Sequence, residues 1–219
     1  MEAESVWRQP ADYSRATVKE PVFQILIKPG QLDNTCMNTL QEYNTVLTFW
    51  FEQTEPAQWW AKDIAFDRRV AELFGTLHRR ACLGELYHWR TEAGGRLAEI
   101  IVLDQFSRNI YRDTPAAFAA DGMALALAQE AVTQGVDQEL PAVERSFFYL
   151  PYMHSESLLI HDVAVELYRA NGIEDNLHFE ILHRDIIARF GRYPHRNAIL
   201  GRQSTAEELA FLQQPDSSF

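Results

Sequence analysis

Apolar residues recur every three or four positions along most of this chain, which is the spacing of amphipathic helices. The pattern predicts helices over about residues 39–51, 63–82, 96–112, 115–135, 141–150, 155–171, 175–190 and from 205 onward. The alternation of apolar and polar residues that is typical of strands is nearly absent. We therefore expect an all-α protein whose antiparallel helices are joined by short loops.

Residues that begin and end helices support these boundaries. Thr39 with Glu42, and Thr205 with Glu208, have the spacing of a capping box. Further signals are Asp63 and Ser155 as N-caps, Pro141 in a first turn, Pro151 as a stop or kink, and Gly172 and Gly191 at helix ends.

The first 38 residues differ from the rest because they mix prolines with one short apolar run, residues 22–27. A lone strand is marginal without partners, so residues 1–38 are predicted to be a non-helical, extended or partly disordered arm. Residues 39–219 are predicted to be a single helical domain. Met37 is a hypothetical translation start, which would place residues 1–36 outside the native protein.

Ionisable residues interrupt the apolar stripes of three predicted helices. Asp104 and Arg108 are spaced i,i+4 and can pair on one helix face. His161 and His183 stand within other apolar stripes. A buried charge is costly unless it is paired, so these residues either pair inside the core or line a wet concavity. Both interpretations are open at this point.

Residues 183–202 form the most basic stretch of the chain. They hold five arginines and one aspartate, a net +4, within a protein of net charge −11, so the remainder carries −15. That balance argues against a nucleic-acid partner but permits a local anion site. The structural alternative is that Gly191 caps the helix while Arg192 and Arg196 lie on its last carbonyls.

Composition and motifs exclude several other classes. The two cysteines, Cys36 and Cys82, suit a reducing, cytoplasmic setting, and the N-terminus has no secretory signal. No apolar run approaches the length of a membrane span, so no membrane partner is expected. Phosphate loops, dinucleotide fingerprints, zinc-protease motifs and nucleophile elbows are absent. We therefore predict neither a metal nor a cofactor.

The polar residues near predicted helix ends form the candidate site. The candidates for proton transfer are His154, His183, His195, Asp104 and Glu156. The candidates for ligand binding are Arg108, Asn109, Arg145, Arg184, Arg192, Arg196 and Asn197. If the helices pack in sequence order, several of these side chains can converge.

Several long strings resemble a known family. VLTFWF (46–51), EIIVLDQFSRNIYR (99–112), ERSFFYLPYMHSE (144–156) and the segment 183–212 closely resemble the bacterial family catalogued as domain of unknown function 924. The resemblance spans about residues 43–213 and implies a fold similar to the right-handed superhelices of tetratricopeptide (TPR-like) proteins. It brings no activity, substrate or catalytic set. Ser107, where the family usually has Pro, is expected to leave its helix more continuous.

Two functions fit these observations. The first is a helical module that binds a small anionic molecule, or a peptide tail through its carboxylate, in a concavity lined by Arg and His. The alternative is a small hydrolase or transferase that acts on a phosphorylated or carboxylated metabolite through a His–carboxylate pair. The sequence assigns neither the ligand nor the oligomeric state.

Overall fold

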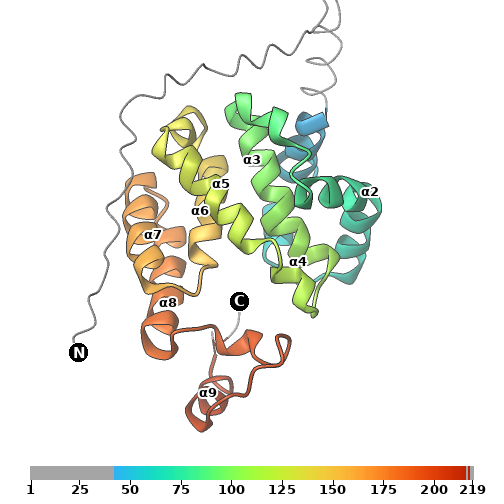
Figure 1. Ribbon diagram of the computed structural model, residues 1–219. Helices are drawn as coiled ribbons and strands as arrows, with labels where there is room; N and C mark the ends of the chain where they lie inside the picture. The colour runs from blue at the N-terminus through green and yellow to red at the C-terminus, as the bar shows by residue number, and fades with distance from the viewer. Residues whose placement is uncertain (1–41, 216, 218–219) are drawn as a thin grey trace, which may run out of the picture.

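The computed structural model describes residues 42–215 and 217, and within them every regular element is helical. Residues 42–47 form a first α-helix. The others are α2 (Ile64–Cys82), α3 (Ala93–Ile101), α4 (Ser107–Ile110), α5 (Asp121–Thr133), α6 (Ala142–Met153), α7 (Leu158–Asn171), α8 (Glu174–Phe190) and α9 (Ala206–Phe211) (Figure 1). The all-α prediction is confirmed. The predictions for residues 1–38 and for Thr39 fall outside the described residues.

Shorter helical segments join or extend these α-helices. Two are π-helical: η1 (Thr48–Glu52) continues the first helix, and η4 (Val102–Phe106) connects α3 to α4. Five are 3₁₀-helical: η2 (Pro56–Trp59), η3 (Tyr87–Thr91), η5 (Pro115–Phe118), η6 (Val136–Glu139) and η7 (Pro194–Arg196). The chain is thus helical without a break from Ala93 to Ile110, as expected with Ser107 in place of Pro.

Most of the predicted caps are present. Asp63 accepts hydrogen bonds from the backbone N–H groups of Ala65 and Phe66, at 2.8 and 3.2 Å, and so begins α2. Thr205 and Glu208 form the reciprocal capping box of α9. Gly191 follows α8 in the left-handed conformation, with φ of 67°, which a glycine adopts without a steric penalty.

One local prediction was wrong, and of the two alternatives for Pro151, a stop or a kink, the structure excludes the stop. Ser155 does not begin a helix, because its N–H donates to the carbonyl of Tyr152 and the chain keeps turning until Ser157, the extended N-cap of α7. Pro151 does not end α6, which continues to Met153. A proline in the last turn removes one backbone hydrogen bond, and the complete burial of this end of α6 holds the turn in place.

Consecutive helices pack against one another around one aromatic core. Helix α6 contacts α5 and α7, and α7 contacts α8; the loops between α6, α7 and α8 are short, so these helices run antiparallel. Helix α2 packs on η4 and α4 at the other side of the molecule (Figure 1). Phe106 of η4 lies against Phe49, Trp50 and Phe74. The helix-pair arrangement is compatible with a TPR-like superhelix, which stays a prediction.

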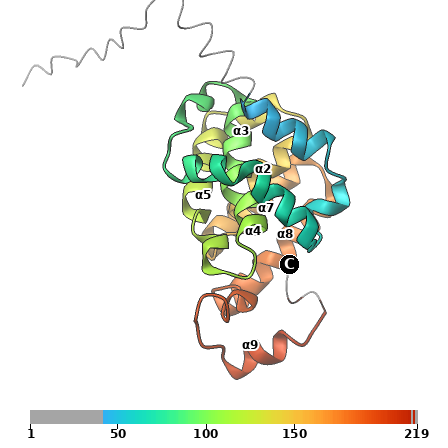
Figure 2. The same cartoon turned by 90° about the vertical axis from the view of Figure 1, so that its right-hand side faces the viewer.

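The chain after α8 forms a separate layer across one end of the helices. Both views show residues 191–215 beneath the body of the molecule, with α9 farthest from it (Figures 1 and 2). Tyr193, which is fully buried, anchors the layer together with Ile186 and Ile187 of α8. This layer closes the end of the bundle where polar side chains gather. Over the described part of the chain, no helix has the length and apolar character needed to cross a membrane.

Candidate functional site

A cavity of ≈ 400 Å³ lies where three segments of the chain meet. Its walls come from η5 and the start of α5, from the end of α6 with the loop after it, and from the segment 196–200. The ionisable residues among them are Asp121, His154, Glu156 and Arg196. The volume is within the range of small-molecule sites.

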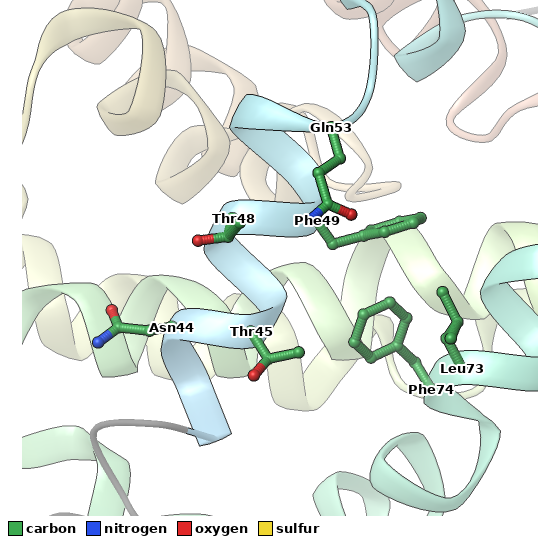
Figure 3. Close-up of a pocket in the computed structure, with 7 residues that line it drawn as sticks. All are labelled: Asn44, Thr45, Thr48, Phe49, Gln53, Leu73 and Phe74. Atoms are coloured by element: carbon green, nitrogen blue, oxygen red, sulfur yellow. The ribbon is translucent and has the colours of Figure 1, made fainter.

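A larger cavity, of ≈ 580 Å³, lies between the first helix and α2. Figure 3 shows that the rings of Phe49 and Phe74 approach each other there beside Leu73, while Asn44 and Thr48 project away from them. None of its lining residues is ionisable. The smaller cavity is therefore the better candidate for a chemically selective site.

Asp104 and His154 form a hydrogen-bonded pair at the wall of the smaller cavity. The π-helical segment η4 presents Asp104, which is fully buried, and Nδ1 of His154 lies 2.8 Å from its Oδ1. Such π-helical turns are frequent at functional sites. Burial alone would raise the pKa of Asp104, but Arg108 and then His154 lower it well below its usual range. Asp104 is thus a carboxylate that accepts a hydrogen bond from Nδ1–H of His154.

His154 is consequently held as a neutral ring with one free acceptor. Burial, followed by the charge of Arg108, lowers the pKa of His154. With the proton on Nδ1, the lone pair is on Nε2, which has no hydrogen-bond partner among the described residues. His154 lines the cavity, so this nitrogen can accept a proton or a hydrogen bond from a bound molecule.

Arg108 joins this pair to Asp121. Its Nη1 donates to the backbone carbonyl of Asp104 at 2.7 Å and lies 3.2 Å from the Asp104 carboxylate. Nη1 and Nη2 also donate to the two carboxylate oxygens of Asp121, at 3.0 and 3.1 Å. The predicted Asp104–Arg108 pair is confirmed. Two carboxylates neutralise Arg108, so it has little capacity left for a ligand.

Arg196 is the cation at the cavity with the fewest protein partners. It is only 6% exposed, and its guanidinium lies between the rings of Phe118 and Tyr193, 4.7 and 4.5 Å from their centroids. Oδ2 of Asp121 is 3.5 Å from Nη1, and Nε is buried without a partner. The guanidinium donates no hydrogen bond to a described residue. The structural alternative, in which Arg196 lies on the last carbonyls of α8, was therefore wrong for this residue.

Glu156 holds the C-terminal layer against the helices. Its carboxylate accepts the backbone N–H of Tyr193 at 2.8 Å and two hydrogen bonds from Arg202, at 2.6 and 2.9 Å. These donors, together with Arg196, lower the pKa of Glu156 even though burial acts in the opposite direction. Glu156 therefore lines the cavity as a carboxylate that positions the segment bearing Arg196.

His183 and His195 lie around the Tyr193 ring and are not among the residues that line the cavity. Their ring centroids are 5.7 and 5.4 Å from that of Tyr193. Burial lowers the pKa of each to about 3, so both are neutral at physiological pH. Nδ1 of His183 donates to the carbonyl of Phe179 at 2.7 Å. Both histidines are therefore grouped around Tyr193 and not in the wall of the cavity.

His161 and Glu180 form a second polar pair, fully buried between α7 and α8. Nδ1 of His161 lies 2.7 Å from Oε1 of Glu180, and Nε2 donates to the carbonyl of Ser155 at 2.9 Å. Burial raises the pKa of Glu180, although the hydrogen bond from His161 acts in the opposite direction. This pair joins two helices and the loop beside the cavity.

The remaining predicted ligand-binding residues lie away from the cavity. Arg145 donates to the carbonyls of Asp137 and Leu140, at 3.2 and 3.0 Å. The others have partners that hold the fold: Arg184 with Asp162, Arg192 with Glu208, Asn109 with Asp67, and Asn197 with Ser204. Of the predicted candidates, His154, Glu156 and Arg196 therefore line the cavity, and Asp104 and Arg108 join it through their bonds to His154 and Asp121.

Three residues of this site were not predicted. Asp121 is the acidic residue in the first turn of α5, and the sequence assigned it no role. Phe118 and Tyr193 were assigned no role. No periodicity in the sequence marks these residues, because their partners come from segments far away in the chain. Among the described residues, no three His, Cys, Asp or Glu side chains are grouped so that they could hold a metal ion.

Comparisons with known proteins place this chain among similar sequences of unassigned role. A family described as "Bacterial protein of unknown function (DUF924)" matches residues 46–216. A solved structure from Agrobacterium tumefaciens, described as the protein of unknown function ATU0120, is 39% identical and has a TM-score of 0.76. That match covers 80% of this chain and 98% of the other. No curated protein matches the chain.

Proposed function

This chain belongs to the bacterial DUF924 family, whose function is unknown, and we propose from the cavity that the protein binds a small organic anion there through the guanidinium of Arg196. The observation that supports this is a buried cation that lines a cavity and donates no hydrogen bond to a described residue. Such a group is costly to bury unless another partner completes its hydrogen bonds.

The surroundings of Arg196 leave its edge as the part that can bind. The guanidinium packs on the rings of Phe118 and Tyr193, with its central carbon 4.7 and 4.5 Å from their centroids. An anion in the plane of the group can accept two parallel hydrogen bonds, which is the geometry in which Arg binds oxyanions most strongly. Asp121 is the competing anion, but at 3.5 Å it is longer than a strong charge-assisted bond.

Arg192 offers a matched control, since it is four residues away and its guanidinium is already bound by both oxygens of Glu208. We expect Arg196→Gln to abolish the binding of small carboxylates and phosphates in calorimetry, and Arg192→Gln to leave it unchanged. Circular dichroism checks that both variants fold. Equal binding by wild type and Arg196→Gln would refute the proposal.

A second candidate, a hydrolase or transferase, is favoured by the Asp104–His154 pair. A carboxylate that fixes the tautomer of a neutral histidine is the arrangement of a general base. p-Nitrophenyl acetate and p-nitrophenyl phosphate are suitable first substrates. Turnover that disappears in His154→Gln, while the thermal midpoint stays within a few degrees, supports catalysis. Turnover that persists in His154→Gln excludes this histidine as the base.

A further inference from the structure

We propose that the ligand is a monocarboxylate with an apolar body, and that the cavity discriminates against phosphate esters and other multiply charged anions. This inference rests on the proposed function and names the chemical class of its ligand. It depends on three features of the cavity: the balance of charges around Arg196, the acceptor groups beside it, and the apolar walls.

Charges around the cavity cancel. Three carboxylates, those of Asp104, Asp121 and Glu156, are matched by three guanidinium groups. Two of these cations, Arg108 and Arg202, are already held by bonds to carboxylates at 3.1 Å or less. Nε of Arg202 is also buried without a partner, but Arg196 is the one cation among the described residues that line the cavity, and its guanidinium donates no hydrogen bond to them. The cavity wall can therefore neutralise one ligand charge and offers no second cation for a dianion.

Acceptors surround that single cation. Oδ2 of Asp121 lies 3.5 Å from its Nη1, and Glu156 lines the same cavity as a carboxylate. Nε2 of His154 adds a lone pair to the wall. A second negative charge on the ligand is repelled by these groups at short range in a partly buried site. A hydroxyl or amino group on the ligand, in contrast, can donate to His154.

Apart from the Ser155 hydroxyl, the rest of the wall is apolar. Its apolar side chains are Pro115, Phe118, Ala119, Leu125, Pro151 and Leu200. These groups cannot solvate the outer oxygens of a phosphate, whereas they favour burial of a hydrocarbon body. A planar carboxylate also satisfies the edge of Arg196 with its two oxygens and leaves no further acceptor without a donor. Shape, charge and wall chemistry thus select the same class of ligand.

The test compares anions that share one apolar body. Calorimetry at about pH 8, where a phosphate monoester is a dianion, measures phenylacetate against phenyl phosphate and phenylacetamide. Hexanoate against hexyl phosphate repeats the comparison with a flexible body. We expect at least one carboxylate to bind about tenfold or more tightly than its phosphate and amide counterparts, a difference that calorimetry readily detects. Binding of that carboxylate is expected to be lost in Arg196→Gln.

Asp121→Asn provides a second arm. Removing this carboxylate should reduce the preference for carboxylates over phosphate esters, because it takes away the negative charge nearest to Arg196. The amide oxygen of the asparagine still accepts a hydrogen bond from Arg108. Its fold is checked by circular dichroism, and the wild-type preference decides the proposal whether or not the variant folds.

The outcomes separate this inference from the proposed function. Phosphate esters that bind as tightly as carboxylates, with binding lost in Arg196→Gln, overturn the selectivity but leave the anion site in place. If neither carboxylate binds at concentrations up to about 10 mM, the assignment of the ligand class is wrong. Binding of the phosphate esters then decides whether the proposed anion site exists. If no anion binds in a way that depends on Arg196, both proposals fail.

Discussion

Replacement of Asp104 by Asn tests whether the buried charges beside the cavity act as one network. The Asp104 carboxylate has three partners: Nδ1 of His154 at 2.8 Å, Nη1 of Arg108 at 3.2 Å and the side-chain amide of Gln105 at 2.6 Å. An asparagine has the same shape but carries no charge, and its NH₂ group faces donors. Loss of one partner from a buried ion pair costs about 3–5 kcal/mol.

The lower end of that range is expected, because Arg108 keeps its two bonds to Asp121. A loss of about 3 kcal/mol lowers the thermal midpoint of a domain of this size by roughly 6–12 °C. Urea denaturation followed by far-ultraviolet circular dichroism measures the free energy of unfolding directly.

Asp162→Asn is the matched control. Asp162 also pairs with an arginine, Arg184, at 2.8 Å, but its side chain is 53% exposed. Exposed ion pairs of this kind contribute about 1 kcal/mol or less. If Asp104→Asn destabilises the protein by no more than this control, the buried network does not stabilise the fold in the way described.

The difference in stability between wild type and Asp104→Asn is expected to depend on pH. The pKa of Asp104 is lower in the folded protein than in the unfolded chain, so the unfolded chain binds more protons as the solution is acidified. The stabilisation is therefore complete above the unfolded pKa of about 4 and declines as the pH falls below it. The difference in unfolding free energy between wild type and Asp104→Asn should shrink in that range. A difference that stays constant from pH 7 to about pH 3 contradicts the assignment.

Two further pairs of substitutions test the packing of the helices. An alanine Cβ at Gly95 would lie 2.1 Å from the backbone oxygen of Trp89, whereas one at Gly75 meets no atom within 4 Å. Thermal melts should show Gly95→Ala destabilised by about 2 kcal/mol or more and Gly75→Ala stabilised by about 0.5–1 kcal/mol; equal midpoints would contradict this. Glu180→Gln should cost less than Glu180→Ala, because the amide keeps the volume and can still hydrogen-bond to Nδ1 of His161, whereas alanine leaves a cavity and an unpaired ring nitrogen at a cost of about 3 kcal/mol. Urea titrations that rank the two alike would contradict this.

Local spacing was enough to predict part of the site. Asp104 and Arg108 are four residues apart in a helical stretch, and that spacing alone brings them to one face. The spacing said nothing of His154, which is fifty residues farther along and meets Asp104 only because α6 packs beside α3. The predicted convergence of candidates was therefore correct for residues that end up on adjacent helices.

The basic segment shows where prediction from the sequence stops. Arg192 and Arg196 are close in sequence and identical in chemistry, yet Arg192 is bound by Glu208 while Arg196 lies between two aromatic rings at the cavity. The difference arises from the turn at Gly191 and the buried Tyr193, which send the two side chains to different neighbours. Asp121 was missed for a related reason, since both its arginine partners come from other segments.

The sequence by itself determined the helical class, the main helices and most of their caps, because those depend on contacts between residues a few positions apart. Only the tertiary structure decided which charges neutralise each other and which cation is left at a cavity. Those outcomes depend on contacts between residues that are tens of positions apart, and the pattern along the chain does not encode which neighbour a side chain will meet. In this protein that distinction separates Arg196 from every other arginine of the basic segment.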